Sequence, residues 1–284
     1  MILFLSDGRL GNQLFQYAFL RTIAAEDEII YTANMDQFVS SFNYGCKAFK
    51  HVPLGRRSIF LIRRFFLPFL RLACSLRLIR SIKQNRTDIS ALSSYSEKKG
   101  LLPITLVETG FFQSENFFLK NKIDFTLKSK FQDEAVHVLR NIPPEFTKVF
   151  VHVRRGDYLT EVYCGNRGID LPRSYFLGAI DIISAEVENP YYIFLSDDPG
   201  YVECCFENIE NKYISTNRME VDFALMTLCN YGVVSNSSFS WWGAYMMQER
   251  RKVIFPKYWY GWKEKVDSHV DIHPSWCEVI DVDR

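Results

Sequence analysis

The sequence predicts an α/β protein whose strands run parallel, and two patterns support this fold class. Beyond residue 148, short apolar segments alternate with segments whose apolar residues recur at helical spacing. The chain also opens with an apolar strand at residues 1–5, a glycine-containing loop and a helix from residue 14, which is how a Rossmann-like unit begins. Strands that alternate with helices indicate a parallel sheet covered on both faces.

The loop after the first strand holds Gly8 and Gly11, without the G-x-G-x-x-G spacing of dinucleotide-binding proteins. A tight backbone turn explains these glycines most simply, and a phosphate cradle is a weaker interpretation. In a third interpretation Asn12 and Gln13, at the start of the helix, reach into a ligand cleft. Further strands of this half are expected at residues 28–33 and 104–107.

A basic segment at residues 56–86 interrupts the first half. Nine Arg and Lys residues alternate there with Phe, Leu and Ile, and no acidic residue occurs. Such a segment can lie as an amphipathic helix on an anionic membrane, or it can pack its aliphatic face on the domain while its charges are solvated. Both interpretations stay open, and Pro68 is expected to break the segment into two helices.

Two consecutive prolines, Pro143 and Pro144, cannot extend a helix, so we place a domain boundary there and expect domains at residues 1–144 and 145–284. Residues 1–150 carry 21 Lys and Arg against 13 Asp and Glu, whereas the rest of the chain carries 13 against 20. This split indicates two regions with different partners. No nucleic-acid-binding signature accompanies the basic half, so we expect no nucleic acid among the partners.

The second domain repeats a strand, a loop and a helix. Strands are expected at residues 148–153, 191–195, 232–235 and 252–255, with helices beginning near Pro172 and covering residues 201–208, 220–230 and 241–249. Because the carboxyl ends of parallel strands share one edge of a sheet, the loops after the first three strands should converge. These loops are residues 154–157, 196–198 and 236–240.

The first of these loops follows a strand on which His152 and Arg154 share one face. Arg154 and Arg155, released from the strand by Gly156, suggest an anion, and a diphosphate is the obvious candidate. A salt bridge between arginine and Asp157 at the strand end is the simpler alternative.

The third loop, residues 236–240, supplies the amide of Asn236 and the hydroxyls of Ser237, Ser238 and Ser240 directly before a helix. One such side chain is enough to cap a helix. The free N–H groups of the same helix start are also suited to an anion. Four polar residues where one cap suffices favour a phosphate.

Asp197 and Asp198, in the second loop, suit either a metal-binding pair or a turn that starts a helix. Arginine and a helix dipole can neutralise a diphosphate without an ion, so we expect no metal. The seven cysteines include no C-x-x-C pair and no histidine spacing that fits zinc, which favours a reduced, cytoplasmic compartment. We expect neither a signal peptide nor a membrane-spanning helix, because no basic n-region and no long uncharged apolar run occurs.

Four stretches together resemble the α-1,2-fucosyltransferases, glycosyltransferase family 11. They are GRLGNQLFQYAF at residues 8–19, HVRRGDY at 152–158, FLSDD at 194–198 and EVDFALMTLCNYGVVSNSSFSWWGA at 220–244. They follow the family's order and leave the basic segment unmatched. The chain departs from the family pattern at Cys229, Asn230, Tyr231 and Gly232, where a histidine is expected before the strand, so no role is carried over for that histidine.

The resemblance implies a GT-B-like fold, in which two Rossmann-like domains face each other across a cleft. The C-terminal domain would hold GDP-fucose and the N-terminal domain the acceptor. The implied reaction is a metal-independent, inverting transfer of L-fucose from GDP-β-L-fucose to the 2-hydroxyl of a galactoside, in the synthesis of O-antigen or another surface glycan. GDP-fucose is then a substrate and no cofactor is expected. The acceptor is a galactose-terminated oligosaccharide or a lipid-linked glycan.

The resemblance also assigns residues. Arg154 would contact the diphosphate and be needed for activity. The other expected contacts are Arg155, Asp197, Asn236, Ser237, Ser238 and Phe239 for GDP-fucose, and Asn12 and Gln13 for the acceptor. Asp157 is expected to pair with Arg155 and hold the loop. The acceptor proton could pass to His152, to Asp7 or to the departing phosphate, and His152 could equally be a buried histidine bonded to a neighbouring loop.

Other functions stay open. A fucosyltransferase of another linkage would share the H-x-R-R motif. A nicotinamide-dependent oxidoreductase would use the N-terminal turn, although its fingerprint is missing. A non-catalytic protein that binds a sugar nucleotide would keep the site without turnover. We expect a cytoplasmic protein, with peripheral contact at the inner membrane face if the basic segment binds lipid.

Overall fold

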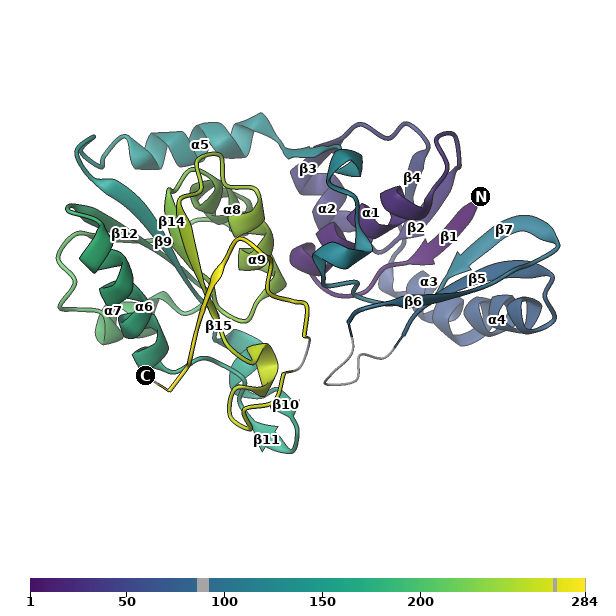
Figure 1. Cartoon of the computed structure of the whole chain (residues 1–284). Helices are drawn as coiled ribbons and strands as arrows, with labels where there is room; N and C mark the ends of the chain where they lie inside the picture. The colour runs from purple at the N-terminus through teal and green to yellow at the C-terminus, as the bar shows by residue number, and fades with distance from the viewer. Residues whose placement is uncertain (86–91, 268–269, 284) are drawn as a thin grey trace. The chain divides into compact units, whose positions relative to one another are not determined.

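The computed structural model describes residues 1–85, 92–267 and 270–283, and the chain divides into two compact units, Met1–Thr126 and Leu127–Arg284 (Figure 1). The sequence placed the boundary at the prolines after residue 142. In the structure, α5 (Ser129–Leu139) belongs to the second unit, where it packs against α8 (Met219–Thr227). No helix within the described residues is both long and apolar enough to span a bilayer.

The described residues of the first unit form a six-stranded sheet of order β4-β2-β1-β7-β5-β6. Its strands are β1 (Ile2–Leu5), β2 (Ile30–Ala33), β4 (Phe49–Val52), β5 (Ile79–Gln84), β6 (Tyr95–Lys98) and β7 (Leu102–Val107). Neighbouring strands are parallel except β5 and β6. Helix α1 (Leu10–Ile23) follows β1 and is buried along most of its length, as expected for a Rossmann-like opening.

Aromatic rings fill much of the core of this unit. The Tyr17 ring lies 4.5 Å from that of Phe38 and 5.0 Å from that of Phe49, and the Tyr17 hydroxyl donates to Asp124 at 2.7 Å. Burial is the larger of the effects that raise the pKa of this phenol, and it therefore stays neutral. The smaller elements here are α2 (Asp36–Ser41), β3 (Phe42–Tyr44), β8 (Phe125–Leu127) and two 3₁₀ turns, Glu115–Phe117 and Lys120–Lys122.

The basic segment is helical from α3 (Arg56–Leu61) through a π-helical turn (Ile62–Phe66) into α4 (Leu67–Ser75). The predicted break at Pro68 is therefore wrong, because Pro68 occupies the first turn of α4, where its missing N–H is tolerated. The preceding π turn widens the helix where a proline ring would otherwise meet a carbonyl group. Arg86, at the end of the predicted segment, lies outside the described residues.

The sheet of the second unit is parallel throughout its described strands, as predicted, with the order β13-β12-β9-β14-β15-β16. Its strands are β9 (Thr147–Val153), β12 (Pro190–Ser196), β13 (Lys212–Ile214), β14 (Tyr231–Val233), β15 (Lys252–Pro256) and β16 (Glu278–Ile280). Smaller elements are the hairpin of β10 (Val162–Tyr163) and β11 (Asn166–Arg167) and two 3₁₀ turns, Gly156–Leu159 and Trp259–Gly261.

Helices cover both faces of this sheet. On one face α6 (Arg173–Glu186) and α7 (Pro199–Cys205) pack against Val149, Val151 and Val153 of β9, and on the other lie α8 and α9 (Ser238–Tyr245) (Figure 1). The alternation of β9 therefore turns His152 toward α9, where its ring lies 5.6 Å from that of Phe239. The carboxyl ends of β9, β12 and β14 share one edge of the sheet.

Candidate functional site

Strand register brings two of the predicted loops together. Val153 of β9 pairs with Ser196 of β12, so the residues that follow, Arg154 and Asp197, leave the sheet side by side. On its other side β9 pairs with β14, and the loop after β14 leaves the sheet at the same edge. The convergence predicted for the three loops is therefore confirmed within the second unit.

Arg154 is held by two carboxylates. Its Nη1 lies 2.7 Å from a carboxylate oxygen of Asp197, and its Nη2 bonds Asp157. The guanidinium carbon also lies 5.3 Å from the centre of the Tyr158 ring. The side chain keeps 17% of its surface exposed, so an anion can still reach an orientationally fixed guanidinium.

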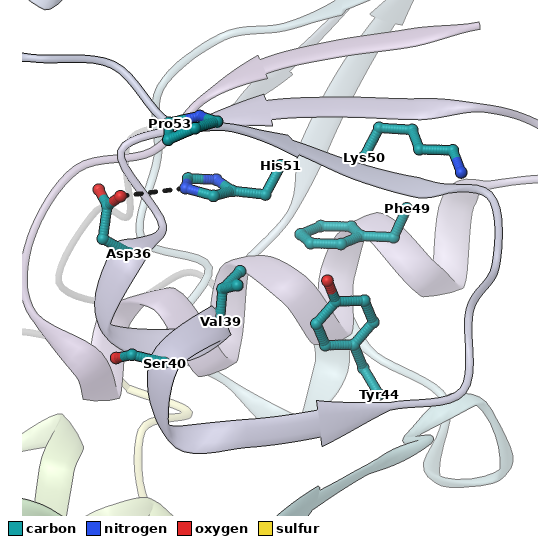
Figure 2. A pocket seen from close by; sticks show the side chains of 8 residues that line it. All are labelled: Asp36, Val39, Ser40, Tyr44, Phe49, Lys50, His51 and Pro53. Atoms are coloured by element: carbon teal, nitrogen blue, oxygen red, sulfur yellow. Dashed lines mark hydrogen bonds and ion pairs between the residues drawn. The ribbon is translucent and has the colours of Figure 1, made fainter.

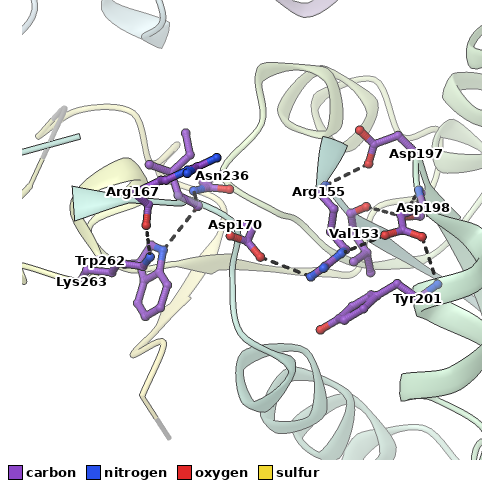
Figure 3. Close-up of polar contacts among 12 residues, drawn as sticks. Val153, Arg155, Arg167, Asp170, Asp197, Asp198, Tyr201, Asn236, Trp262 and Lys263 are labelled. Carbon is purple, nitrogen blue, oxygen red and sulfur yellow. Dashed lines mark hydrogen bonds and ion pairs between the residues drawn. The ribbon is translucent and has the colours of Figure 1, made fainter. Parts of the chain in front are cut away.

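Arg155 ties the same loop to its surroundings (Figure 3). Its backbone N–H donates to Asp197 at 2.9 Å, its Nε donates to Asp198 at 3.1 Å, and its Nη1 lies 3.3 Å from Asp170. Its guanidinium stacks 3.6 Å from the centre of the Tyr201 ring. These contacts anchor the loop, and Arg155, like Arg154, is paired with two carboxylates.

The partners of the two arginines differ from the prediction. Asp157 was expected to pair with Arg155, and it pairs with Arg154 instead, three residues earlier, where the chain leaves β9 and enters the 3₁₀ turn Gly156–Leu159. Gly156 also makes room for this arrangement: a Cβ atom there would lie 2.3 Å from Oδ2 of Asp197. A larger residue at this position would require the Asp197 carboxylate to shift.

His152 is almost completely buried, and its Nδ1 lies 2.7 Å from Oγ of Ser235. Burial, and to a smaller extent the charge of Arg154, lowers the pKa of His152 to about 3. An imidazole with this pKa is a weak base at neutral pH. The geometry favours the alternative of a buried histidine bonded to a neighbouring loop.

The loop before α9 is anchored through Asn236. Its amide Nδ2 donates to the backbone oxygen of Ile169 at 2.6 Å, while its buried Oδ1 has no hydrogen-bond partner among the described residues. Ser237 occupies the N-cap position of α9, but its side chain makes no capping hydrogen bond to the described residues of that helix. Ser238 and Phe239 are half-buried in the first turn. The capping interpretation therefore does not account for Ser237.

One buried acid was missed by sequence reasoning. Asp222, in the first turn of α8, accepts a hydrogen bond from Ser215, the residue after β13. Burial raises the pKa of Asp222 to about 7, although the bond from Ser215 opposes the shift. Asp222 lies between Val221 and Phe223 in the otherwise apolar run VDFALM, and this carboxylate among apolar neighbours was the signal that could have found it. Asp170 carried no comparable signal, because it lies between regular elements.

The two residues expected to contact the acceptor, Asn12 and Gln13, differ in their burial and in their hydrogen bonds. Gln13 is buried, its Nε2 donates to the backbone oxygens of Gly8 and Asn34 at 3.3 Å each, and its Oε1 accepts the N–H of Phe38 at 2.9 Å. It thus holds the turns after β1 and β2. Asn12 is half-buried and accepts from Gln113 at 2.6 Å.

A hollow of about 640 Å³ lies elsewhere in the first unit (Figure 2). It is lined by Asp36, Val39, Ser40, Tyr44, Phe49, Lys50, His51 and Pro53. Asp36 and Pro53 follow the carboxyl ends of β2 and β4, and Nε2 of His51 lies 3.1 Å from Asp36. Aromatic rings beside a carboxylate and a hydroxyl are a combination suited to a sugar.

Acidic residues are numerous around the two arginines, but they do not form a metal site. Within the described ranges, no group of three or more His, Cys, Asp or Glu residues is arranged to hold a metal ion. Four carboxylates, from Asp157, Asp170, Asp197 and Asp198, instead bind Arg154 and Arg155.

The sequence was compared with protein families and curated proteins. The family Glycosyl transferase family 11 matches residues 1–278. An α-1,2-colitosyltransferase of Escherichia coli is 28% identical over 205 residues, 65% of this chain and 67% of that protein. Galactoside α-(1,2)-fucosyltransferase 1 of Oryctolagus cuniculus is 30% identical over 258 residues, 84% of this chain and 62% of that protein. The O-antigen biosynthesis glycosyltransferase WbnK of Escherichia coli is 31% identical over 134 residues, 45% of this chain and 43% of that protein.

The fold was compared with solved structures. The α-1,6-fucosyltransferase NodZ soaked with GDP-fucose matches with a TM-score of 0.54 at 12% identity, over 89% of this chain and 93% of that one. POFUT1 in complex with GDP matches with a TM-score of 0.51 at 14% identity, over 89% of this chain and 97% of that one. These likenesses confirm the predicted GT-B-like fold class, and at such identities they concern the fold alone. The chain spans about two thirds or less of the length of the three curated relatives above.

Proposed function

The chain belongs to glycosyltransferase family 11, and we propose on that basis that it is a galactoside 2-α-L-fucosyltransferase. It would transfer L-fucose, with inversion and without a metal, from GDP-β-L-fucose to the 2-hydroxyl of a galactoside during synthesis of O-antigen or another surface glycan. The observation that carries the proposal is Arg154, fixed by Asp157 and Asp197 at the carboxyl edge of a parallel sheet. Ligands bind at this edge in open α/β folds.

The reaction needs positive charge where the donor loses its sugar. As the bond between fucose and phosphate breaks, negative charge grows on the GDP oxygens, and Arg154 is positioned to stabilise it. Asp157 and Asp197 orient the guanidinium before the donor arrives, so little reorganisation is required. Arg155, Asp197, Asn236, Ser237, Ser238 and Phe239 complete the proposed donor site.

The fucosyl group passes through an oxocarbenium-like state, so bond breaking can run ahead of attack by the acceptor. The acceptor hydroxyl must still lose its proton. His152 is poorly suited to take it, because burial lowers its pKa to about 3. We propose that the departing phosphate accepts the proton, since Asp7, the other candidate from the sequence, lies 3.1 Å from Arg63.

The two units would divide the substrates between them, with GDP-fucose in the second and the acceptor in the first. The hollow around Asp36 and His51 supports this assignment, because it offers aromatic and hydrogen-bonding groups to a sugar. Asn12 remains a proposed acceptor contact, whereas Gln13 would act indirectly through the turns that it holds. Contact with an anionic membrane would bring the enzyme to a lipid-linked acceptor.

A turnover assay tests the proposal directly. The protein is incubated with GDP-fucose and a panel of galactosides that differ in the neighbouring sugar, and the linkage of the product is determined. Fucose on the 2-hydroxyl of galactose is the expected result. A donor carrying activated colitose is included, because one relative is named as a colitosyltransferase. Calorimetric binding of NAD without binding of GDP would contradict the proposal and support a nicotinamide-dependent protein.

A further inference from the structure

The helical segment of α3, the π turn and α4 exposes a series of large apolar side chains. Between 51% and 65% of each is accessible to solvent: Phe60, Leu61, Phe65, Phe66, Phe69, Leu72 and Leu76. Single exposed apolar residues are common on soluble proteins, but a contiguous set of this size marks an interaction surface. We name this surface the α3–α4 face.

These side chains are exposed although another face of the same helix is already packed on the sheet. Leu67, Leu70 and Cys74 already pack on the sheet, together with Ile79 and Leu106. A second stripe, with spacings of four, three and four residues, runs along the outer side of the helix: Phe65, Phe69, Leu72 and Leu76. The fold uses one apolar face of α4 and leaves another uncovered.

Positive charge surrounds the uncovered stripe. Six arginines of the segment are exposed, and they are Arg56, Arg57, Arg63, Arg64, Arg71 and Arg77. Arg63 lies 3.1 Å from Asp7, whereas within the described part of the chain the other five make no ion pair with a carboxylate. Since residues 56–86 contain no acid, the segment does not neutralise itself.

We propose that the α3–α4 face docks on an anionic lipid bilayer. Lipid headgroups can pair with the arginines while the Phe and Leu side chains enter the boundary between headgroups and acyl chains. A second copy of the chain would bring arginines against arginines. A nucleic acid would match the charge but leave the apolar stripe in water. The proposal does not depend on the transfer reaction, because it concerns binding of the α3–α4 face to lipid and its test contains no substrate.

Vesicle sedimentation tests the proposal on the whole protein without any substrate. The protein should sediment with vesicles that contain phosphatidylglycerol and remain in solution with phosphatidylcholine vesicles. Changing Arg63, Arg64, Arg71 and Arg77 to Gln should weaken binding by about 100-fold or more, because each basic residue near an anionic surface contributes substantially. In the matched control, four exposed basic residues elsewhere are changed to Gln: Lys47, Lys120, Lys130 and Arg140. This variant should keep most of its binding to phosphatidylglycerol vesicles.

A second variant separates insertion from charge alone. Phe65→Ser, Phe69→Ser and Leu72→Ser together should also release the protein, whereas Leu119→Ser, Val136→Ser and Val162→Ser should not. An unchanged circular dichroism spectrum and an unchanged thermal unfolding midpoint in each variant show that the fold survives. The proposal is overturned if the unmodified protein ignores anionic vesicles, if the apolar variant binds them normally, or if light scattering shows that the face instead joins two copies of the chain.

Discussion

The guanidinium of Arg154 lies 2.7 Å from a carboxylate oxygen of Asp197, and the two residues are the first beyond neighbouring parallel strands. The register that pairs Val153 with Ser196 produces this contact. A side chain held in this way loses little further freedom when it binds an anion, which is the basis of preorganised electrostatic stabilisation. The contact therefore links the topology of the sheet to the proposed chemistry.

Arg154→Ala should reduce fucosyl transfer by about 100- to 1,000-fold or more, the range seen when one such donor is removed from a preorganised site. Arg154→Lys should also fail, because an ammonium cannot reproduce the two-sided contact with Asp157 and Asp197. Initial rates with saturating GDP-fucose measure the effect, and circular dichroism checks the fold. Near-normal turnover by Arg154→Ala would exclude the assigned role.

Gly156→Ala should disturb the contact between Arg154 and Asp197 by adding a Cβ atom beside the Asp197 carboxylate. The added Cβ would lie 2.3 Å from Oδ2 of Asp197, so the carboxylate must move away from Arg154. We expect weaker GDP binding in calorimetry with little loss of stability, because the end of a flexible carboxylate side chain can shift at small cost. Gly200→Ala, where a Cβ meets nothing within 4 Å, is the matched control. Equal behaviour of the two variants would refute the steric argument.

Sequence reasoning found the loops of this site but not the pairs within it. Alternation along a strand is sufficient to place His152 and Arg154 on one face, and parallel topology is sufficient to bring the loops to one edge. One of the two carboxylate partners of Arg155, Asp170, lies in an irregular stretch whose path depends on tertiary packing. The pairing of Asp157 with Arg154 depends on the path of the chain between β9 and the 3₁₀ turn Gly156–Leu159, which no periodic pattern reveals.

The helical continuity of the basic segment shows a similar limit. Proline normally marks the end of a helix, and Pro68 was expected to do so. The π turn that accommodates it has no recognisable sequence signal.

His152 should make the protein less stable in acid. Its pKa is lowered to about 3 in the folded protein from an ordinary value of 6.5, so the neutral form is favoured by folding. The corresponding stability is present above pH 6.5 and is lost as the pH falls toward 3. Between pH 7 and pH 5 the loss should be about 2 kcal/mol.

Urea denaturation of the wild type and of His152→Gln at both pH values isolates this contribution. The difference in unfolding free energy between the wild type and His152→Gln should be about 2 kcal/mol smaller at pH 5 than at pH 7. His137→Gln, a change at an exposed histidine of α5, is the control. A difference that stays constant with pH would contradict the buried neutral imidazole.

Asp222 should make the protein less stable as the pH rises, which is the opposite of the effect of His152. Its pKa is raised from 3.8 to about 7, so folding favours the protonated carboxyl, and stability falls as the pH rises between these values. Asp222→Asn keeps an acceptor for Ser215 and removes the ionisation. The unfolding free energy of Asp222→Asn relative to that of the wild type should rise by up to about 4 kcal/mol from pH 4 to pH 8. Asp181→Asn, on the exposed side of α6, is the control, and a gain of equal size at both pH values would disprove the linkage.

Asp36 tests whether the hollow of the first unit binds the acceptor. Its side chain is 61% exposed, so its carboxylate is available to a sugar hydroxyl, and it also orients His51. Removing one hydrogen bond of this kind costs about 0.5–1.5 kcal/mol, so Asp36→Ala should raise the KM for the galactoside about 3- to 10-fold. The KM for GDP-fucose and the kcat should change little, because Arg154 and the donor site are untouched. Asp27→Ala, at an exposed carboxylate before β2, controls for the loss of charge. An unchanged acceptor KM, or an equal rise for both substrates, would remove the hollow from the acceptor site while leaving the role of Arg154 intact.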